Sequence, residues 1–153
     1  MIPPSPGKDD AWFWAGVDQG KLLIQRCVPC GTLHHPPMPM CPECGSEEWA
    51  PHETSGLGSV HTWILSRHPS RRAETGSARP GVGTSDAGGD DEVRIVVLVE
   101  LEEGPRIVSN LLGVRPEDMC NDMAVRVCFE RFDDGVTLPQ FRPVVPRPEP
   151  AAG

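Results

Sequence analysis

The alternation of apolar and polar residues in the second half of the chain predicts short β-strands rather than long helices. The expected strands are residues 59–66, 93–101, 106–112, 124–130 and 136–141. Between the third and fourth of them, Pro116 can start one helical turn. A five-stranded Greek-key barrel, the OB-fold, carries its helix in that connection. The sequence therefore predicts an OB-fold over residues 56–143.

The same alternation predicts which side chains share a face of a strand, because successive residues point to opposite sides. For residues 59–66 it places three residues on one face, namely Val60, Thr62 and Ile64. The opposite face of that strand would carry His61, Trp63 and Leu65. In residues 124–130 one face would carry Val125, Val127 and Phe129, and the other Arg126, Cys128 and Glu130.

Residues 67–92 interrupt the strand pattern. They are rich in Gly, Ser and Pro and have no apolar periodicity, which predicts a long loop that is disordered in isolation. Residues 102–105 and 133–135 have the composition of turns. The Pro-rich stretch from Pro143 is expected not to extend the sheet.

The N-terminal pattern differs from the rest. Residues 9–20 predict a short helix, capped by Asp9 or Asp10 and followed by Gly20 in the left-handed conformation. Residues 21–26 lead out of it like a strand. The helix carries too many large apolar side chains for a solvated element, and we expect them to pack on the rest of the protein or on a partner: Trp12, Phe13, Trp14 and Val17.

Two CxxC pairs predict a metal site. The segments CVPCG (27–31) and CPECG (41–45) hold Cys27, Cys30, Cys41 and Cys44. Each pair can turn both sulfurs toward one ion, and four thiolates give the closed tetrahedral shell of a structural zinc site. Iron in a rubredoxin-like carrier and two disulfides are the alternatives. With four cysteines available, His34 and His35 are interpreted as ordinary ribbon residues.

Composition and charge argue against two classes of protein, those that bind nucleic acid and those that span a membrane. The 153 residues contain 18 prolines and 16 glycines, and the formal net charge is −8. An acidic chain whose only lysines are Lys8 and Lys21 is poorly suited to follow a phosphate backbone. We find no 18-residue apolar run and no secretory signal at the N-terminus, so no membrane span is expected and the cytoplasm is the expected compartment.

Other reactive side chains form no recognisable constellation. Cys120 and Cys128 are single thiols that we interpret as unreactive. His52, His61 and His68 have no nucleophile at an informative spacing. The sequence contains no nucleophile elbow, phosphate loop or HExxH motif, and nothing in it argues for catalysis.

Taken in order, the motifs resemble a known family. AWFWAG, GKLLIQRC, the two cysteine pairs, a GxGxVHTW strand, VLVELEEGPRIVSNLLG and LPQFRP follow one another from about Trp12 to Pro143. This order is similar to the zinc-ribbon plus OB-fold family called domain of unknown function 35. Two features depart from that family. The segment 67–92 is longer than the usual connection, and Val93-Arg94 stand where the family has an aromatic residue. In addition, Asp122 stands where the family tends to have a glycine.

The resemblance implies a non-catalytic accessory subunit. Members of that family associate with thiolase-fold acyl-CoA enzymes, such as thiolases and lipid-transfer-like aldolases of lipid or steroid side-chain degradation, and help hold the CoA thioester. It implies a hetero-oligomer with acyl-CoA handled in the complex, and an interface to which the ribbon and the helix contribute. The density of large rings in the helix places Trp12, Phe13 and Trp14 in that expected interface. The alternatives are a single-stranded nucleic-acid-binding OB-fold and an iron rubredoxin-like electron carrier.

The expected organisation has four parts. Residues 1–24 form an N-terminal helical segment and residues 25–55 a rubredoxin-like zinc ribbon. Residues 56–143 form the OB-fold and residues 144–153 a Pro-rich tail. The fold class is therefore mainly β with one short N-terminal helix.

Overall fold

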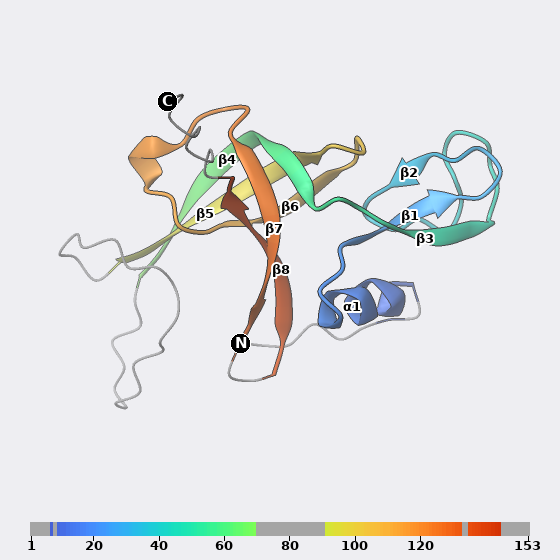
Figure 1. The fold of residues 1–153 in the computed structure, drawn as a ribbon, viewed down its shortest axis with the longest axis horizontal. Coiled ribbons are helices and arrows are strands. Elements are labelled where there is room, and N and C mark those ends of the chain that lie inside the picture. The colour runs from blue at the N-terminus through green and yellow to red at the C-terminus, as the bar shows by residue number, and fades with distance from the viewer. Residues whose placement is uncertain (1–6, 8, 70–90, 133–134, 145–153) are drawn as a thin grey trace, which may run out of the picture.

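The computed structural model describes residues 7, 9–69, 91–132 and 135–144, and it contains one α-helix, two β-sheets and one 3₁₀ turn in that part of the chain (Figure 1). The N-terminal elements are α1 (Ala11–Asp18), β1 (Leu23–Cys27), β2 (Leu33–His34) and β3 (Trp49–Glu53). The C-terminal elements are β4 (Leu57–Pro69), β5 (Asp91–Leu101), β6 (Arg106–Leu111), the 3₁₀ turn η1 (Pro116–Asp118), β7 (Ala124–Arg131) and β8 (Thr137–Pro143). Within the described residues, no helix is long and apolar enough to cross a membrane.

The larger sheet closes into a barrel with strand order β4-β5-β6-β8-β7. The start of β4 closes it, since Leu57 and Gly58 pair with Arg126 and Val125 of β7. The link between β6 and β8 is parallel and consists of Leu111 opposite Phe141. The 3₁₀ turn lies between the third and fourth barrel strands, as the sequence predicts. The OB-fold is therefore confirmed.

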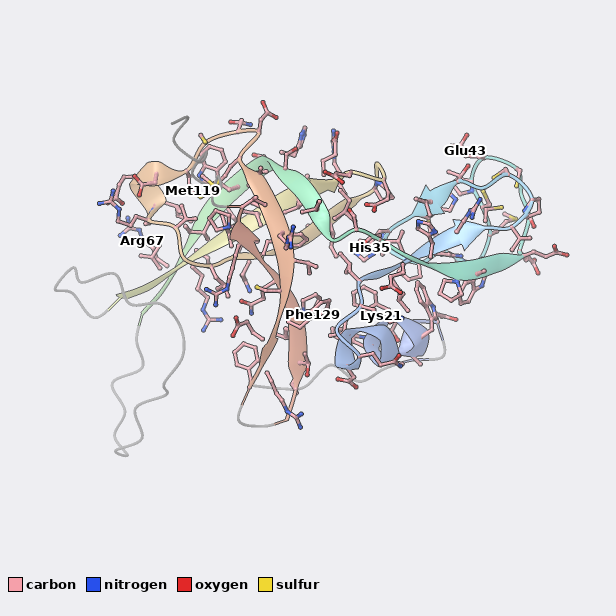
Figure 2. All side chains as sticks on the ribbon, viewed as in Figure 1. Lys21, His35, Glu43, Arg67, Met119 and Phe129 are labelled. Carbon is pink, nitrogen blue, oxygen red and sulfur yellow. The ribbon has the colours of Figure 1, made fainter. Side chains whose placement is uncertain are left out.

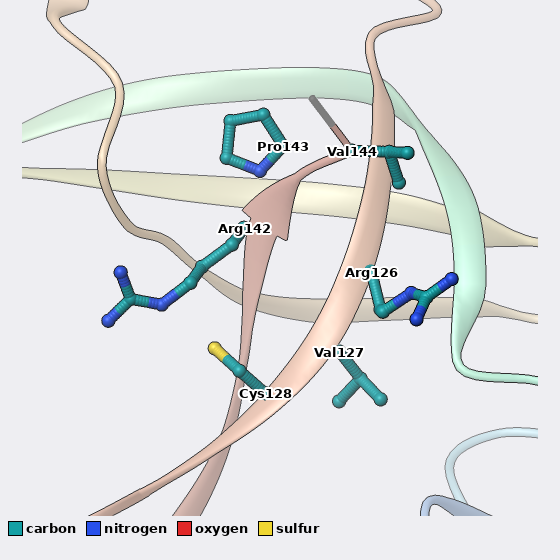
Figure 3. A pocket seen from close by; sticks show the side chains of 6 residues that line it. All are labelled: Arg126, Val127, Cys128, Arg142, Pro143 and Val144. Atoms are coloured by element: carbon teal, nitrogen blue, oxygen red, sulfur yellow. The ribbon is translucent and has the colours of Figure 1, made fainter. Parts of the chain in front are cut away.

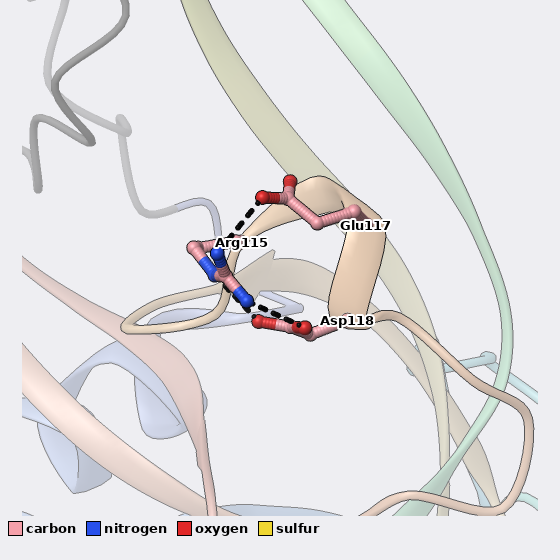
Figure 4. Close-up of polar contacts among 3 residues, drawn as sticks. All are labelled: Arg115, Glu117 and Asp118. Atoms are coloured by element: carbon pink, nitrogen blue, oxygen red, sulfur yellow. Dashed lines mark hydrogen bonds and ion pairs between the residues drawn. The ribbon is translucent and has the colours of Figure 1, made fainter.

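The 3₁₀ turn is held at its surface by one arginine. Arg115 donates from Nε and Nη2 to both carboxylate oxygens of Asp118, at 2.8 and 2.9 Å, and its Nη1 lies 3.2 Å from Glu117 Oε1 (Figure 4). A bidentate arginine–carboxylate pair fixes orientation better than a single hydrogen bond. These contacts stabilise the conformation of the connection between β6 and β7.

The expected loop at 67–92 is shorter at both ends. Arg67, His68 and Pro69 continue β4 and pair with Val93, Glu92 and Asp91 of β5. These residues have few apolar side chains and therefore lack a strand pattern. They still pair, because backbone groups form the hydrogen bonds between the two strands. The central part, residues 70–90, lies outside the described residues, so its expected disorder stays a prediction.

The last strand extends further than expected. Pro143, which was expected not to extend the sheet, is the last residue of β8, and the Val144 amide donates to the Ala124 carbonyl.

A β-bulge changes the predicted faces of β4. The register shifts between Val60 and Thr62, so His61 is an extra residue relative to β5. Val60 is fully buried, but Ile64, predicted to share its face, is 65% exposed. Trp63 packs against the core instead. The predicted alternation of faces therefore holds before the bulge and after it, but residues on opposite sides of the bulge do not share the face predicted for them.

The helix ends as the sequence predicts but begins differently. Gly20 has φ +73°, and the amides of Gly20 and Lys21 donate to the carbonyls of Val17 and Gly16, a Schellman ending. Asp10 stands at the N-cap without bonding a helix amide in the way a cap does. Its carboxylate instead accepts hydrogen bonds from the Gly7 amide and from Trp14 Nε1.

Helix, ribbon and barrel share one core. Leu22, just before β1, and Ile24 of β1 are buried in the same cluster as Val125 and Phe141 of the barrel. Figure 2 shows side chains filling the space between these parts, with the labelled His35 between the ribbon and the barrel. The ribbon is therefore packed onto the barrel and is not merely tethered to it.

Candidate metal centre

Two similar turns carry the four cysteines. In the first, the Gly31 amide donates to the Cys27 carbonyl at 2.9 Å, and in the second the Gly45 amide donates to the Cys41 carbonyl at 2.8 Å. Both glycines have positive φ, +75° and +73°, which an L side chain rarely adopts. The CxxCG spacing therefore encodes the turn directly, and this is why it can be recognised in a sequence.

The four sulfur atoms converge. The Sγ atoms of Cys27, Cys30, Cys41 and Cys44 all lie within 4.8 Å of one another. Cys27 Sγ is 3.5 Å from Cys44 Sγ, and Cys30 Sγ is 3.6 Å from Cys41 Sγ. Tetrahedral Zn–S bonds of about 2.3 Å require sulfur separations of about 3.8 Å. The donor set therefore fits a four-thiolate metal ion.

Two side chains surround these sulfurs without belonging to the set. Thr32 Oγ1 lies 3.2 Å from Cys30 Sγ, and hydrogen bonds from Thr32 lower the pKa of Cys30 to about 6. His34 Nε2 lies 3.2 Å from Cys41 Sγ. Hydrogen bonds to sulfur favour the thiolate, which is the form that binds metal. The sequence interpretation of His34 as an ordinary ribbon residue missed this contact.

Gln25 holds the segment that leads to the second cysteine pair. It is 5% exposed, and its side-chain amide donates to the Met38 carbonyl at 2.7 Å and accepts from the Met38 amide at 2.6 Å. A buried amide with both groups bonded costs little and fixes a loop. In the sequence, the one feature that could have indicated this role is the position of polar Gln25 directly after the apolar Ile24.

The three aromatic residues of α1 have different environments. Phe13 is 8% exposed and packs in the core, and its place in the expected interface stays a prediction. Trp12 and Trp14 are half-buried. Trp12 lies against Trp49, with ring centroids 5.1 Å apart. An interface at Trp12 and Trp14 stays a prediction.

The barrel aromatics pack inward. Phe141 is fully buried, and Trp63 and Phe129 pack against the core. Phe132 is half-buried. A single-strand-binding surface needs exposed rings on which bases stack. In the described part of the barrel, these rings are a poor platform for that alternative.

A shallow cleft of about 340 Å³ lies beside the middle of β7 and the end of β8 (Figure 3). It is lined by Arg126, Val127, Cys128, Arg142, Pro143 and Val144. In Figure 3 the guanidinium groups of Arg126 and Arg142 point away from each other. Burial raises the pKa of the Cys128 thiol, which opposes thiolate formation and agrees with the interpretation of Cys128 as unreactive.

A metal-binding ribbon followed by an OB-fold barrel defines the class of protein. Two family models match the chain in succession: the rubredoxin-like zinc ribbon domain of ChsH2 at residues 14–50, and the C-terminal OB-fold domain of ChsH2 at residues 51–130. The chain belongs to this ChsH2 family of zinc-ribbon and OB-fold proteins.

Individual relatives agree with that assignment. A probable enoyl-CoA hydratase alpha subunit of Thermomonospora curvata is 38% identical over 95% of the chain, which spans 41% of that relative's length. A DUF35 domain-containing scaffold protein of Pyrococcus furiosus is 31% identical over 87% of the chain and 91% of its own length. The solved structure of an Ltp2-ChsH2(DUF35) aldolase contains a chain that is 37% identical, with a TM-score of 0.75 over 93% of this chain and 99% of that one.

Proposed function

We propose that the chain is a non-catalytic accessory subunit that binds a thiolase-fold acyl-CoA enzyme and helps hold the CoA thioester. The observation that carries the proposal is the match along 93% of the chain to a chain of the Ltp2-ChsH2(DUF35) aldolase. The scaffold name of the Pyrococcus relative supports the accessory role, and the hydratase subunit name of the Thermomonospora relative supports the link to acyl-CoA chemistry. The cytoplasm stays the expected compartment.

We propose zinc as the ion at Cys27, Cys30, Cys41 and Cys44. Four protein thiolates fill a tetrahedral shell and leave no position for water or substrate, so the ion would hold the ribbon together rather than act on a substrate. Elemental analysis should find about one zinc per chain, and the purified protein should be colourless. A coloured protein containing iron would favour the rubredoxin-like carrier instead.

The partner role is tested with a defined probe. The purified full chain is mixed with the Ltp2 subunit of the solved aldolase, and complex formation is followed by size-exclusion chromatography with light scattering. We expect a hetero-oligomer, with no thiolase, aldolase or hydratase activity in the chain alone. Tight binding to single-stranded DNA at physiological salt, with no binding to Ltp2, would overturn the proposal.

A further inference from the structure

Strand β5 is apolar on both of its faces. Ile95, Val97 and Val99 point into the barrel and are at most 5% exposed. The residues between them, Val96 and Leu98, therefore point outward, where they are only half-buried. Strands that face water on one side usually alternate apolar and polar residues, whereas continuous apolar runs are typical of strands covered on both sides. In the part of the chain that the structure describes, the outer side of β5 has no such cover.

The strand register extends this apolar surface over β5's neighbours. Ile64 of β4 is paired with Val96, and Val108 of β6 is paired with Leu98. Paired residues share a face, so these four aliphatic side chains lie together on the outside of the barrel. Ile64 is 65% exposed and Val108 67% exposed. We call Ile64, Val96, Leu98 and Val108 the β4–β6 outer face.

Polar groups border the β4–β6 outer face. At one end Arg106 and Glu100 form an ion pair at 2.8 Å. At the other end Ser66 is paired with Arg94 across the same strands. An apolar centre with a polar rim is the usual anatomy of a protein–protein interface.

The β4–β6 outer face continues into a hollow. Val108 and Asn110 also line a cleft of about 380 Å³, whose lining includes Asp10, Phe13, Trp14 and His35. Burial lowers the pKa of His35, so its imidazole adds no positive charge to the cleft. An exposed apolar sheet beside a cleft suits a partner that inserts one anchor side chain and covers the surface around it.

We propose that the β4–β6 outer face and this cleft form the surface on which the enzyme subunit docks. This inference rests on the proposed function, which supplies the partner, and adds where the partner binds. A second copy of the chain is a weaker occupant, because each copy has a formal net charge of −8 and two copies would repel each other. The partner would present an apolar patch that covers this face and one side chain that enters the cleft.

Two substitutions test the surface, and one serves as a matched control. Ile64→Asp and Val108→Asp each place a carboxylate at the centre of the apolar face, on side chains exposed enough for the fold to tolerate the change. Val144→Asp makes the same change at an aliphatic residue that is 39% exposed at the end of β8, outside this surface. Binding of the full-length variants to the Ltp2 subunit is measured by calorimetry, and the mass of each variant alone by light scattering.

We expect Ile64→Asp and Val108→Asp each to weaken binding about tenfold or more, with metal content and thermal midpoint unchanged, and Val144→Asp to bind like the wild type. Normal binding by both surface variants would overturn the docking surface and leave the proposed function standing. Failure of the wild type to bind Ltp2 would overturn both. A wild-type dimer that Ile64→Asp converts to a monomer would assign the surface to a second copy.

Discussion

His34 contacts one of the four cysteines of the candidate metal centre but is not a member of the four-cysteine set. Its Nε2 lies 3.2 Å from Cys41 Sγ and, when it carries the proton, donates to that sulfur. Such contacts orient a ligand and tune its charge, and their loss typically lowers metal affinity 10- to 100-fold. We expect His34→Ala to lower zinc affinity by about tenfold, measured by competition with a chromophoric chelator. The exposed His61 provides the control, and equal losses in His61→Ala would contradict a role for this contact.

Glu103 joins the end of the ribbon to the barrel. Its Oε1 accepts the Ser55 amide at 2.6 Å, while its Oε2 is buried without a hydrogen-bond partner in the described structure. Burial alone would raise the pKa of Glu103, but hydrogen bonds from Ser55 and from its own amide outweigh burial and lower it. Because the pKa is lower in the folded state, the Glu103 carboxylate stabilises the fold at pH values above its ordinary pKa of 4.5. This contribution is lost as the pH falls through the folded-state pKa.

This sign gives a pH-dependent prediction. We expect Glu103→Gln to lower the free energy of unfolding by about 1 kcal/mol at pH 6 to 7. The difference from wild type should shrink as the pH falls below 4.5, because the wild-type carboxyl then becomes neutral too. Urea unfolding at several pH values measures it, with the exposed Glu47→Gln as control. A difference that stays constant down to pH 3 would mean that charge is not the cause.

Asp122 occupies a position where the backbone favours glycine. Its φ is +60°, and it has the only positive φ of a non-glycine residue in the part of the chain that the structure describes. This explains why a glycine is expected there from the family resemblance. We expect Asp122→Gly to raise stability by about 1 kcal/mol and Asp122→Ala to lower it, in thermal unfolding. Opposite signs would show that the Asp122 side chain, rather than its backbone, matters.

The contrast between ligands and supporting residues shows what the sequence can reveal about single positions. The cysteines are recognisable because each CxxCG turn is local. Gln25 reaches Met38, 13 residues away, and Ser55 reaches Glu103, 48 residues away. No sequence pattern encodes such distances, because the fold alone brings these groups together.

At the scale of elements, α1 offers a test of which rings bind and which rings fold. Trp12→Ala and Trp14→Ala should each leave metal content and far-UV circular dichroism unchanged, and at least one should weaken binding to the Ltp2 subunit by about 2 kcal/mol. Phe13→Ala, which empties a buried site, should instead destabilise the fold by about 3 kcal/mol or more. If both tryptophan variants unfold like Phe13→Ala, the helix belongs wholly to the core.

Strands β4 and β5 show why element positions were easier to predict than side-chain faces. The apolar run 93–101 located β5, but the bulge at His61 depends on how β4 pairs with β5, which alternation within one strand does not contain. Ile64 was consequently assigned to the same face as Val60. Its exposure is what makes the β4–β6 outer face visible.

At the scale of the whole molecule, the order of strands and the helical turn before β7 were enough to predict the OB-fold. The packing of the ribbon on the barrel was not, since it depends on contacts between distant segments. Leu22 and Ile24 lie just before the first cysteine pair and are buried with Val60 and Phe141. The boundaries at residues 24, 55 and 143 stay predictions, but the core continues across the first two.

This shared core predicts that metal removal destabilises the entire described fold. If the ion is bound at a free concentration about a thousandfold above its Kd, it contributes about 4 kcal/mol, and chelation should lower the thermal midpoint by about 10 °C. Two variants separate the parts by fluorescence. Trp63→Phe leaves the three tryptophans of the helix and ribbon as reporters, and replacing Trp12, Trp14 and Trp49 with Phe leaves the barrel reporter Trp63.

Each variant should unfold in one transition, and chelation should lower the midpoint by the same amount in both, because β1 cannot leave the core without exposing barrel residues to water. Adding zinc back should restore both midpoints. The opposite result is a Trp63 signal that ignores chelation while the other tryptophans report melting. That result would make ribbon and barrel independent units, and would confine the metal's stabilising effect to residues near the four cysteines.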